Sequence, residues 1–119
     1  MTETTFENAV DDMVGRLHPI LLTIQQGGGE GALYSLQQQL IELMGLVERN
    51  PGIEAATGDL YAAAEALVAD QTVRSQPIAR KLRLLADAHQ RFREHLPAAR
   101  PLKPGQRSVW LHGNLRFAA

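Results

Sequence analysis

The segment IARKLRLLADAHQRFREHL, residues 78–96, decides the fold. Its apolar side chains recur at spacings of 4, 3, 4, 3 and 4, and one of these places is taken by a histidine: Ile78, Leu82, Leu85, His89, Phe92 and Leu96. This spacing is typical of one face of an α-helix that packs against another helix. Ser75 is a suitable N-cap, and Pro97 ends the pattern because proline cannot continue a helix. The segment therefore predicts an amphipathic helix.

Three earlier segments have similar patterns. The first holds Phe6, Val10, Met13, Leu17, Ile20 and Ile24, again spaced 4, 3, 4, 3 and 4. Because this pattern continues through Pro19, it predicts one kinked helix rather than two. The second segment, about 32–49, holds Leu33, Leu36, Leu40, Leu43, Met44 and Val47. The third opens at Pro51 after an Asn50 cap and holds Ile53, Ala56, Leu60, Ala63 and Leu67, with a potential break at 57–59.

Together the four segments predict an all-α protein, an antiparallel bundle of about four helices over residues 1–97. Helices of similar length joined by short loops favour this arrangement. The apolar stripes are narrow, as in a coiled-coil seam, so that each helix contributes little core. Pairing of two chains into a homodimer is therefore expected.

Residues 98–119 form a separate basic and apolar tail. Pro101 and Pro104 disfavour a helix at its start. Gly113 and Asn114 then suit a two-residue hairpin turn, which would place Trp110 opposite Phe117. A single helical turn is the competing prediction.

An isolated hairpin is marginal in water, so the apolar side chains of the tail must lie on something. That surface is its own bundle, a second copy or another protein. Trp and Arg are frequent interface anchors. The predicted partner-binding residues are Trp110, Leu111, Leu115, Phe117, Arg107 and Arg116.

Charge divides the chain into two halves, although the net charge is only −1. Residues 1–72 hold two bases and eleven acids, a net of −9, whereas residues 73–119 hold ten bases and two acids, a net of +8. The absence of cysteine excludes disulfides, thiolate metal sites and a thiol nucleophile. The acidic N-terminus does not resemble a signal peptide, and no apolar run is long enough to span a membrane. We therefore expect a soluble cytoplasmic protein.

The glycine-rich stretch GGGEG, residues 27–31, raises the question of a phosphate site. Gly27, Gly29 and Ala32 formally match G-x-G-x-x-A. The dinucleotide motif needs a strand before it, whereas a helix is predicted here. The stretch is therefore interpreted as a flexible linker, and no cofactor is predicted.

Histidine and carboxylate positions offer little chemistry. His89 occupies a seam position and is either a half-buried histidine bonded to a neighbour or a pH-sensitive contact between helices. His89 and His95 point about 120° apart on a helix, so one zinc ion cannot bind both, and no metal is predicted. Glu7 and Asp11 share a helix face, but without a cleft they are interpreted as a solvated surface. No nucleophile motif is present, which argues against an enzyme.

The basic residues of the last helix admit three interpretations. Arg83 and Arg91 each lie four residues from Asp87 and can pair with it locally. The helix can also face the acidic third helix, within one chain or between chains. Alternatively Arg80, Lys81, Arg83 and Arg91 form a nucleic-acid surface together with the tail, although a pI of about 6.4 argues against this.

These observations favour a non-enzymatic protein-interaction module. Such a module could be a small adaptor, a chaperone-like partner, an inhibitor or an immunity-type binder, with a bundle face and the tail making the contact. The alternative is a nucleic-acid-binding regulator that uses the basic fourth helix and the tail.

Overall fold

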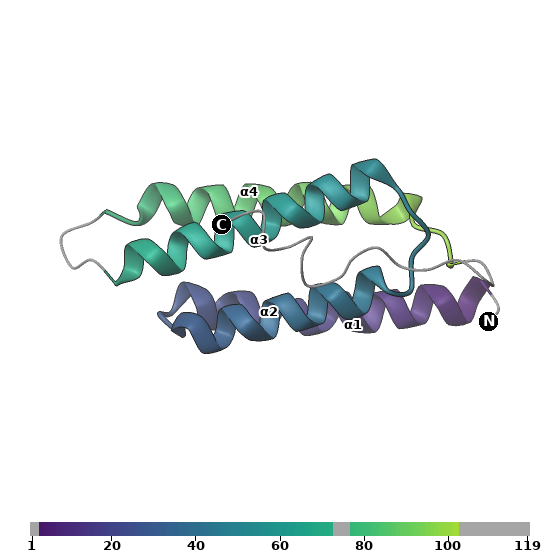
Figure 1. Ribbon diagram of the computed structural model, residues 1–119, viewed down its shortest axis with the longest axis horizontal. Coiled ribbons are helices and arrows are strands. Elements are labelled where there is room, and N and C mark those ends of the chain that lie inside the picture. The colour runs from purple at the N-terminus through teal and green to yellow at the C-terminus, as the bar shows by residue number, and fades with distance from the viewer. Residues whose placement is uncertain (1–2, 73–76, 103–119) are drawn as a thin grey trace.

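The computed structural model describes residues 3–72 and 77–102, and four α-helices account for most of them. The helices are α1 (Glu3–Gln25), α2 (Gly29–Met44), α3 (Pro51–Gln71) and α4 (Ala79–His95), and a 3₁₀ turn, η1 (Leu96–Ala98), follows α4. Successive helices run antiparallel, with α1 and α2 below α3 and α4 in Figure 1. The predicted all-α bundle is confirmed. The predicted hairpin and Trp110 lie outside the described residues.

The core lies along the axis of the bundle and receives side chains from every helix. The largest fully buried side chains are Leu17, Ile24, Leu36, Leu40, Leu43, Met44, Ile53, Leu60, Leu67, Leu85 and Phe92. All of them belong to the predicted stripes. Each such side chain stabilises the fold by roughly 1.5–3 kcal/mol through its removal from water. Met13 and Ile20 are only partly buried, whereas Leu21 is buried, so the core face of α1 is turned slightly from the predicted one.

α1 continues through Pro19 as one helix, as predicted. Proline lacks the backbone N–H that would bond to the carbonyl of Gly15, so one hydrogen bond of the helix is missing there. One turn later the hydroxyl of Thr23 donates to the carbonyl of Pro19 at 2.9 Å. The side chain of Thr23 is thereby held in one orientation beside the end of the helix.

The turn between α1 and α2 is tighter than the predicted linker over residues 27–31. The amide of Gly28 donates to the carbonyl of Thr23 at 2.8 Å, and that of Gly27 donates to Ile24 at 3.1 Å. This pair of bonds, with Gly27 at φ 91°, is a Schellman motif. α2 then starts at Gly29, so that two of the predicted linker glycines belong to the helix. Gly27 thus ends α1, as a linker after that helix requires, but the connection is shorter than the predicted residues 27–31 because Gly29 and Gly31 belong to α2.

α2 is also shorter than predicted, since it ends at Met44 rather than near Arg49. The residues after it pair with the start of the tail. The amide of Glu48 donates to the carbonyl of Arg100, and the amide of Leu102 donates to that of Leu46, both at 2.9 Å. This antiparallel bridge draws residues 46–48 out of the helix. The described start of the tail is thus attached to the α2–α3 connection.

α3 begins as predicted. The side chain of Asn50 accepts a hydrogen bond from the amide of Ile53 at 3.1 Å, and the carboxylate of Glu54 accepts one from the amide of Asn50 at 3.1 Å. Arg49 also forms an ion pair with Glu54 at 3.0 Å. The potential break at residues 57–59 does not occur. Thr57 is buried, and its hydroxyl donates to the carbonyl of Ile53 at 2.7 Å, which removes the cost of an unpaired hydroxyl in the core.

α4 starts at Ala79, with Ile78 at the N-cap and no side-chain cap. The predicted cap, Ser75, lies outside the described residues. At the other end the helix passes into η1 at Leu96, one residue before Pro97, so the predicted end is confirmed.

Candidate interaction groove between α1 and α4

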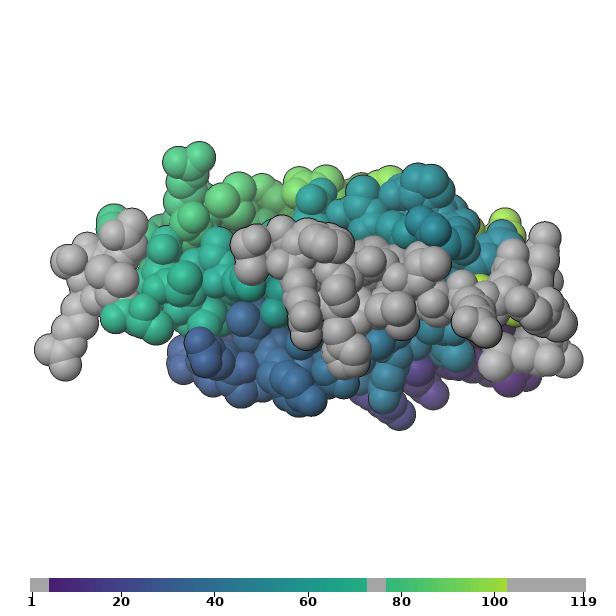
Figure 2. All heavy atoms as spheres, viewed as in Figure 1, coloured from purple at the N-terminus to yellow at the C-terminus, as the bar shows by residue number. Residues whose placement is uncertain are grey.

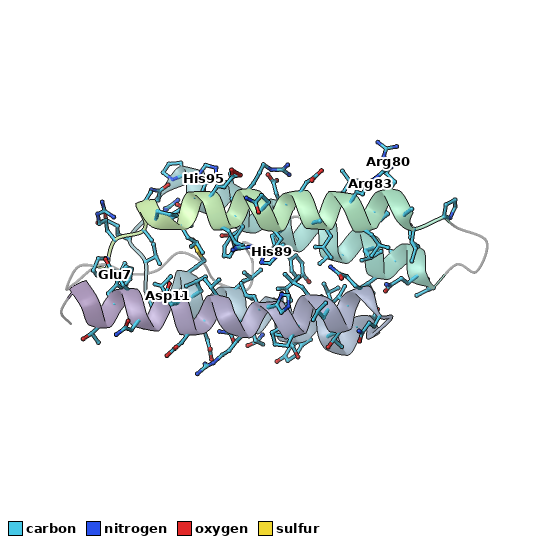
Figure 3. The ribbon with its side chains drawn as sticks, turned by 180° about the vertical axis from the view of Figure 1, so that it is seen from behind. Glu7, Asp11, Arg80, Arg83, His89 and His95 are labelled. Atoms are coloured by element: carbon cyan, nitrogen blue, oxygen red, sulfur yellow. The ribbon has the colours of Figure 1, made fainter. Side chains whose placement is uncertain are left out.

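The helices α1 and α4 lie on the same side of the bundle but touch each other little. α3 packs extensively on α4 and α2 packs on α1, whereas close contacts between α1 and α4 are sparse. Two hollows open along α1. One of about 200 Å³ lies between α1 and α4, and one of about 470 Å³ lies between the N-terminal half of α1 and the chain from Arg93 through η1 to Pro101. We call this feature the α1/α4 groove, and Figure 3 faces it. The opposite face, in Figure 2, is formed by α2 and α3.

One regular stripe of α1 forms a wall of the groove. Its members are Glu7, Asp11, Val14, His18, Leu21 and Gln25, and all of them line one of the two hollows. Its spacing is 4, 3, 4, 3 and 4, and each member follows by one residue a member of the apolar stripe from Phe6 to Ile24. A matching stripe of Ala86, Gln90 and Arg93 on α4, continued by Pro97 of η1, lines the hollows. Positions beside a seam are those that determine partner choice in coiled coils.

The larger hollow has an apolar floor and charges of both signs at its rim. Phe6, Val10 and Leu96 are buried at its base. Glu7 and Asp11 lie on the α1 wall, facing α4 in Figure 3, and Arg93 and Arg100 lie on the opposite wall. The guanidinium of Arg100 donates to the carbonyls of Pro97 and Ala99 at 3.3 and 2.9 Å.

Glu7 and Asp11 are exposed, as predicted for a solvated acidic face, but the expected absence of a cleft beside them is wrong. They border a hollow, because η1 and the residues after it curve past the N-terminal half of α1. The four charged side chains on the rim are exposed, so each pairing across the hollow is weak in water. The two acids nevertheless give the α1 wall a negative charge, whereas Arg93 and Arg100 give the opposite wall a positive charge.

The smaller hollow holds His18 from α1 and His89 from α4, with Leu22 and Gln25 beside them. Figure 3 shows His89 between the two helices. Burial lowers the pKa of His89, and the positive charge of Arg93 and the proximity of His18 lower it further. His89 is therefore a half-buried, preferentially neutral histidine at a helix–helix boundary. Leu22 remains 40% exposed at the edge of this hollow.

His95 does not join His89. It lies beside Gly52 at the start of α3, where a Cβ on that glycine would be 3.1 Å from Nδ1 of His95. Within residues 3–72 and 77–102 no group of three or more histidines and carboxylates is arranged to hold a metal ion. The predicted divergence of the two histidines is thus confirmed.

The basic side chains of α4 are divided between two environments. Lys81 forms an ion pair with Asp70 of α3 at 3.8 Å, which supports the interpretation that α4 faces the acidic third helix within the chain. Arg80, Arg83 and Arg91 are exposed, and Figure 3 shows Arg80 and Arg83 on the outer side of α4.

The predicted local pairs with Asp87 are absent from the described part of the chain, where the ion pairs are Lys81 with Asp70 and Arg49 with Glu54. Asp87 and Glu94 are exposed on the same outer stripe of α4 as the arginines. The stripe therefore alternates in sign and is only weakly basic.

The predicted partner-binding residues Arg107, Trp110, Leu111, Leu115, Arg116 and Phe117 lie outside the described residues. The chain nevertheless enters the tail at the groove, since Pro101 lines the larger hollow. What sequence analysis missed is the groove itself, in particular the meeting of His18 with His89 and of Glu7 with Arg93. The signal available in the sequence was the second stripe on α1.

Comparison with known proteins gives no match, whether with protein-family models, with curated proteins or with solved structures. In the part of the chain that the structure describes, none of the helices combines the length and the apolar character needed to cross a membrane. The function is therefore inferred from the groove and from the tail that begins beside it.

Proposed function

We propose that the chain is a non-enzymatic protein-interaction module, which binds a protein through the α1/α4 groove and its C-terminal tail. The observation that carries this proposal is the groove. Two neighbouring helices of an otherwise packed bundle stay apart and present apolar floors with a charged rim. Hollows of this kind suit the insertion of side chains from a protein surface.

The tail supports the same proposal. Its described part passes the larger hollow at Pro101, and its sequence further on combines Trp110 and Phe117 with Arg107 and Arg116. Aromatic and arginine side chains are the commonest anchors of protein interfaces. A cytoplasmic location, expected from the sequence, belongs to this proposal.

Site-specific photo-crosslinking in cells tests it. A benzophenone amino acid replaces Trp110 in one variant and Leu22, at the edge of the groove, in a second. Tyr34 provides the matched control, because it is an aromatic residue on α2, 62% exposed and outside both hollows. Discrete protein adducts at positions 110 and 22, but not at 34, are the expected result. Equal labelling at all three positions would refute the proposal.

A nucleic-acid-binding regulator is the second candidate, and the exposure of Arg80, Arg83 and Arg91 favours it. Against it stand Asp87 and Glu94 on the same stripe of α4. Phosphate contacts make affinity fall steeply with salt, by a slope that follows the number of contacts. The affinity for a labelled DNA or RNA duplex, measured at two salt concentrations, decides between the candidates. It is measured for the wild type and for a variant in which the three arginines are changed to glutamine. A steep salt slope that flattens in the variant would favour the regulator.

A further inference from the structure

We infer that the α1/α4 groove receives the same groove of a second copy, related by a two-fold axis parallel to the helices. This inference rests on the proposed function and names its partner. The occupant is chosen by the charge of the two walls, by their heptad spacing and by the size of the groove.

Charge selects both the partner and the axis. The α1 wall carries Glu7 and Asp11, and the α4 wall carries Arg93, with Arg100 just beyond it. Rotation about an axis along the helices places α1 of each copy over α4 of the other, with the same ends adjacent. The acids of one copy then meet the arginines of the second, so that walls of opposite sign alternate around the four helices.

The other two-fold axis in this face, perpendicular to the helices, does not give this match. It would place α1 over α1 of the second copy in opposite directions. Glu7 would then lie over the region of Gln25, and Arg93 over that of Ala86, neither of which carries a charge. The charges therefore specify one of the two symmetric arrangements.

The spacing of the walls suits helix packing. The stripe of α1 from Glu7 to Gln25 has the alternating spacing 4, 3, 4, 3 and 4 of a helix seam, and the stripe from Ala86 on α4 to Pro97 on η1 has the spacing 4, 3 and 4. Between the charged end and the far end the α1 stripe carries Val14, which is only partly buried and which a facing helix can cover. Leu21 of the same stripe is already buried in the core of its own chain. Four helices joined along these stripes would form a second bundle between the two copies.

Size indicates that the tail contributes as well. Eighteen residues of α1 span about 27 Å, and two adjacent helices are roughly 20 Å wide, so each groove offers on the order of 540 Å². Stable complexes bury roughly 800 Å² on each partner. Residues 103–119 follow Leu102 in the sequence, and this length of chain is available to supply the difference.

Charge exchange tests the inference. One variant carries Arg93→Glu and another carries Glu7→Arg with Asp11→Arg. All three positions are exposed on helices, so the helix content should be unchanged, which circular dichroism checks. In each variant alone, position 93 of one copy faces positions 7 and 11 of the other with charges of the same sign, whereas a mixture of the two variants restores opposite charges there between copies. Light scattering after size-exclusion chromatography at low salt gives the mass, to be compared with 13.1 kDa for one chain.

The wild type should have twice the chain mass, each variant alone the mass of one chain, and the mixture again twice that mass. Charge pairing confined to one chain predicts no gain on mixing, so an unchanged mixture would overturn the inference. A monomeric wild type, or variants that remain dimers, would do the same. If the wild type is monomeric and photo-crosslinking captures a different protein, the inference of a second copy is overturned while the proposed function is supported.

Discussion

Alanine substitutions at Gly28 and Gly31 should change stability in opposite directions, although the two glycines lie three residues apart. Gly28 has φ −64° and ψ −12°, which alanine adopts without strain, so only space opposes the change. An added Cβ would lie 2.5 Å from Cγ2 and 2.8 Å from the carbonyl oxygen of Thr23, and 3.1 Å from Cβ of Ala32. Thr23 cannot turn away freely, because its hydroxyl bonds to Pro19 and its carbonyl accepts from Gly28.

Overpacking of this kind costs about 1–3 kcal/mol. At Gly31 nothing lies within 4 Å of an added Cβ, and the position is an exposed one in α2. There Gly31→Ala should stabilise the protein by up to about 1 kcal/mol through helix propensity. The two variants should therefore differ by roughly 1–4 kcal/mol in the free energy of unfolding.

Urea unfolding followed by circular dichroism measures this difference, with all proteins at one concentration because self-association shifts apparent stability. A third variant, Gly28→Ala with Thr23→Ser, removes the methyl contact and keeps the contact with the carbonyl oxygen. It should recover only part of the loss. Equal stability of the Gly28→Ala and Gly31→Ala variants would refute the assignment of the turn as a close-packed helix end.

Three further predictions concern the cap, the histidine and the tail. Asn50→Ala should lower the free energy of unfolding by about 1 kcal/mol, because the amide of Ile53 loses its acceptor, whereas Asn50→Asp should preserve it; thermal melts of both decide. The pKa of His89 in the folded protein lies below its ordinary value of 6.5, so as the pH falls the imidazole is protonated in the unfolded chain before it is protonated in the folded one. The free energy of unfolding should therefore fall as the pH drops below 6.5. Thermal melts across this range should show a smaller loss of stability for His89→Gln than for the wild type. Trp110→Ala should weaken self-association while helix content stays near normal, and a variant that unfolds would show that the tail belongs to the core.

The helices could be predicted because each depends on local information. The stripe from Leu36 to Leu43, or that from Ile53 to Leu67, requires only side-chain spacing within one segment, and these residues are buried in the structure. The Asn50 cap was predictable for the same reason, since its bond to Ile53 spans three residues. Local patterns thus determine which segments become helical and which face they bury.

The end of α2 was not predictable, since contacts that are distant in sequence determine it. The stripe of α2 continues to Val47, yet the helix ends at Met44 because residues 46–48 pair with residues 100–102. No periodicity in residues 32–49 announces that pairing. The glycine turn is a different case. Its sequence offers several glycines, and only the bonds to Thr23 and Ile24 decide which of them ends α1.

The candidate site was predictable in its components but not in their arrangement. His89 was conspicuous as a polar residue in a seam, but the neighbour that shares its hollow, His18, comes from a helix distant in sequence. Arg93 and Glu7 are likewise brought together only by the antiparallel order of α1 and α4. Assigning which helix faces which requires the packing of the whole bundle.

The composition of the second stripe of α1 argues that it does more than face water. A helix needs one apolar stripe to enter a bundle, and the residues beside it are free to be charged or polar throughout. Here that neighbouring stripe carries acids only at one end, at Glu7 and Asp11, with Val14, His18, Leu21 and Gln25 further along. Packing in its own core explains Leu21, which is buried, but it does not explain why the acids are confined to one end. A wall that is acidic at one end is complementary to a wall with arginine at the matching end, which the proposed second copy would present through Arg93 of α4.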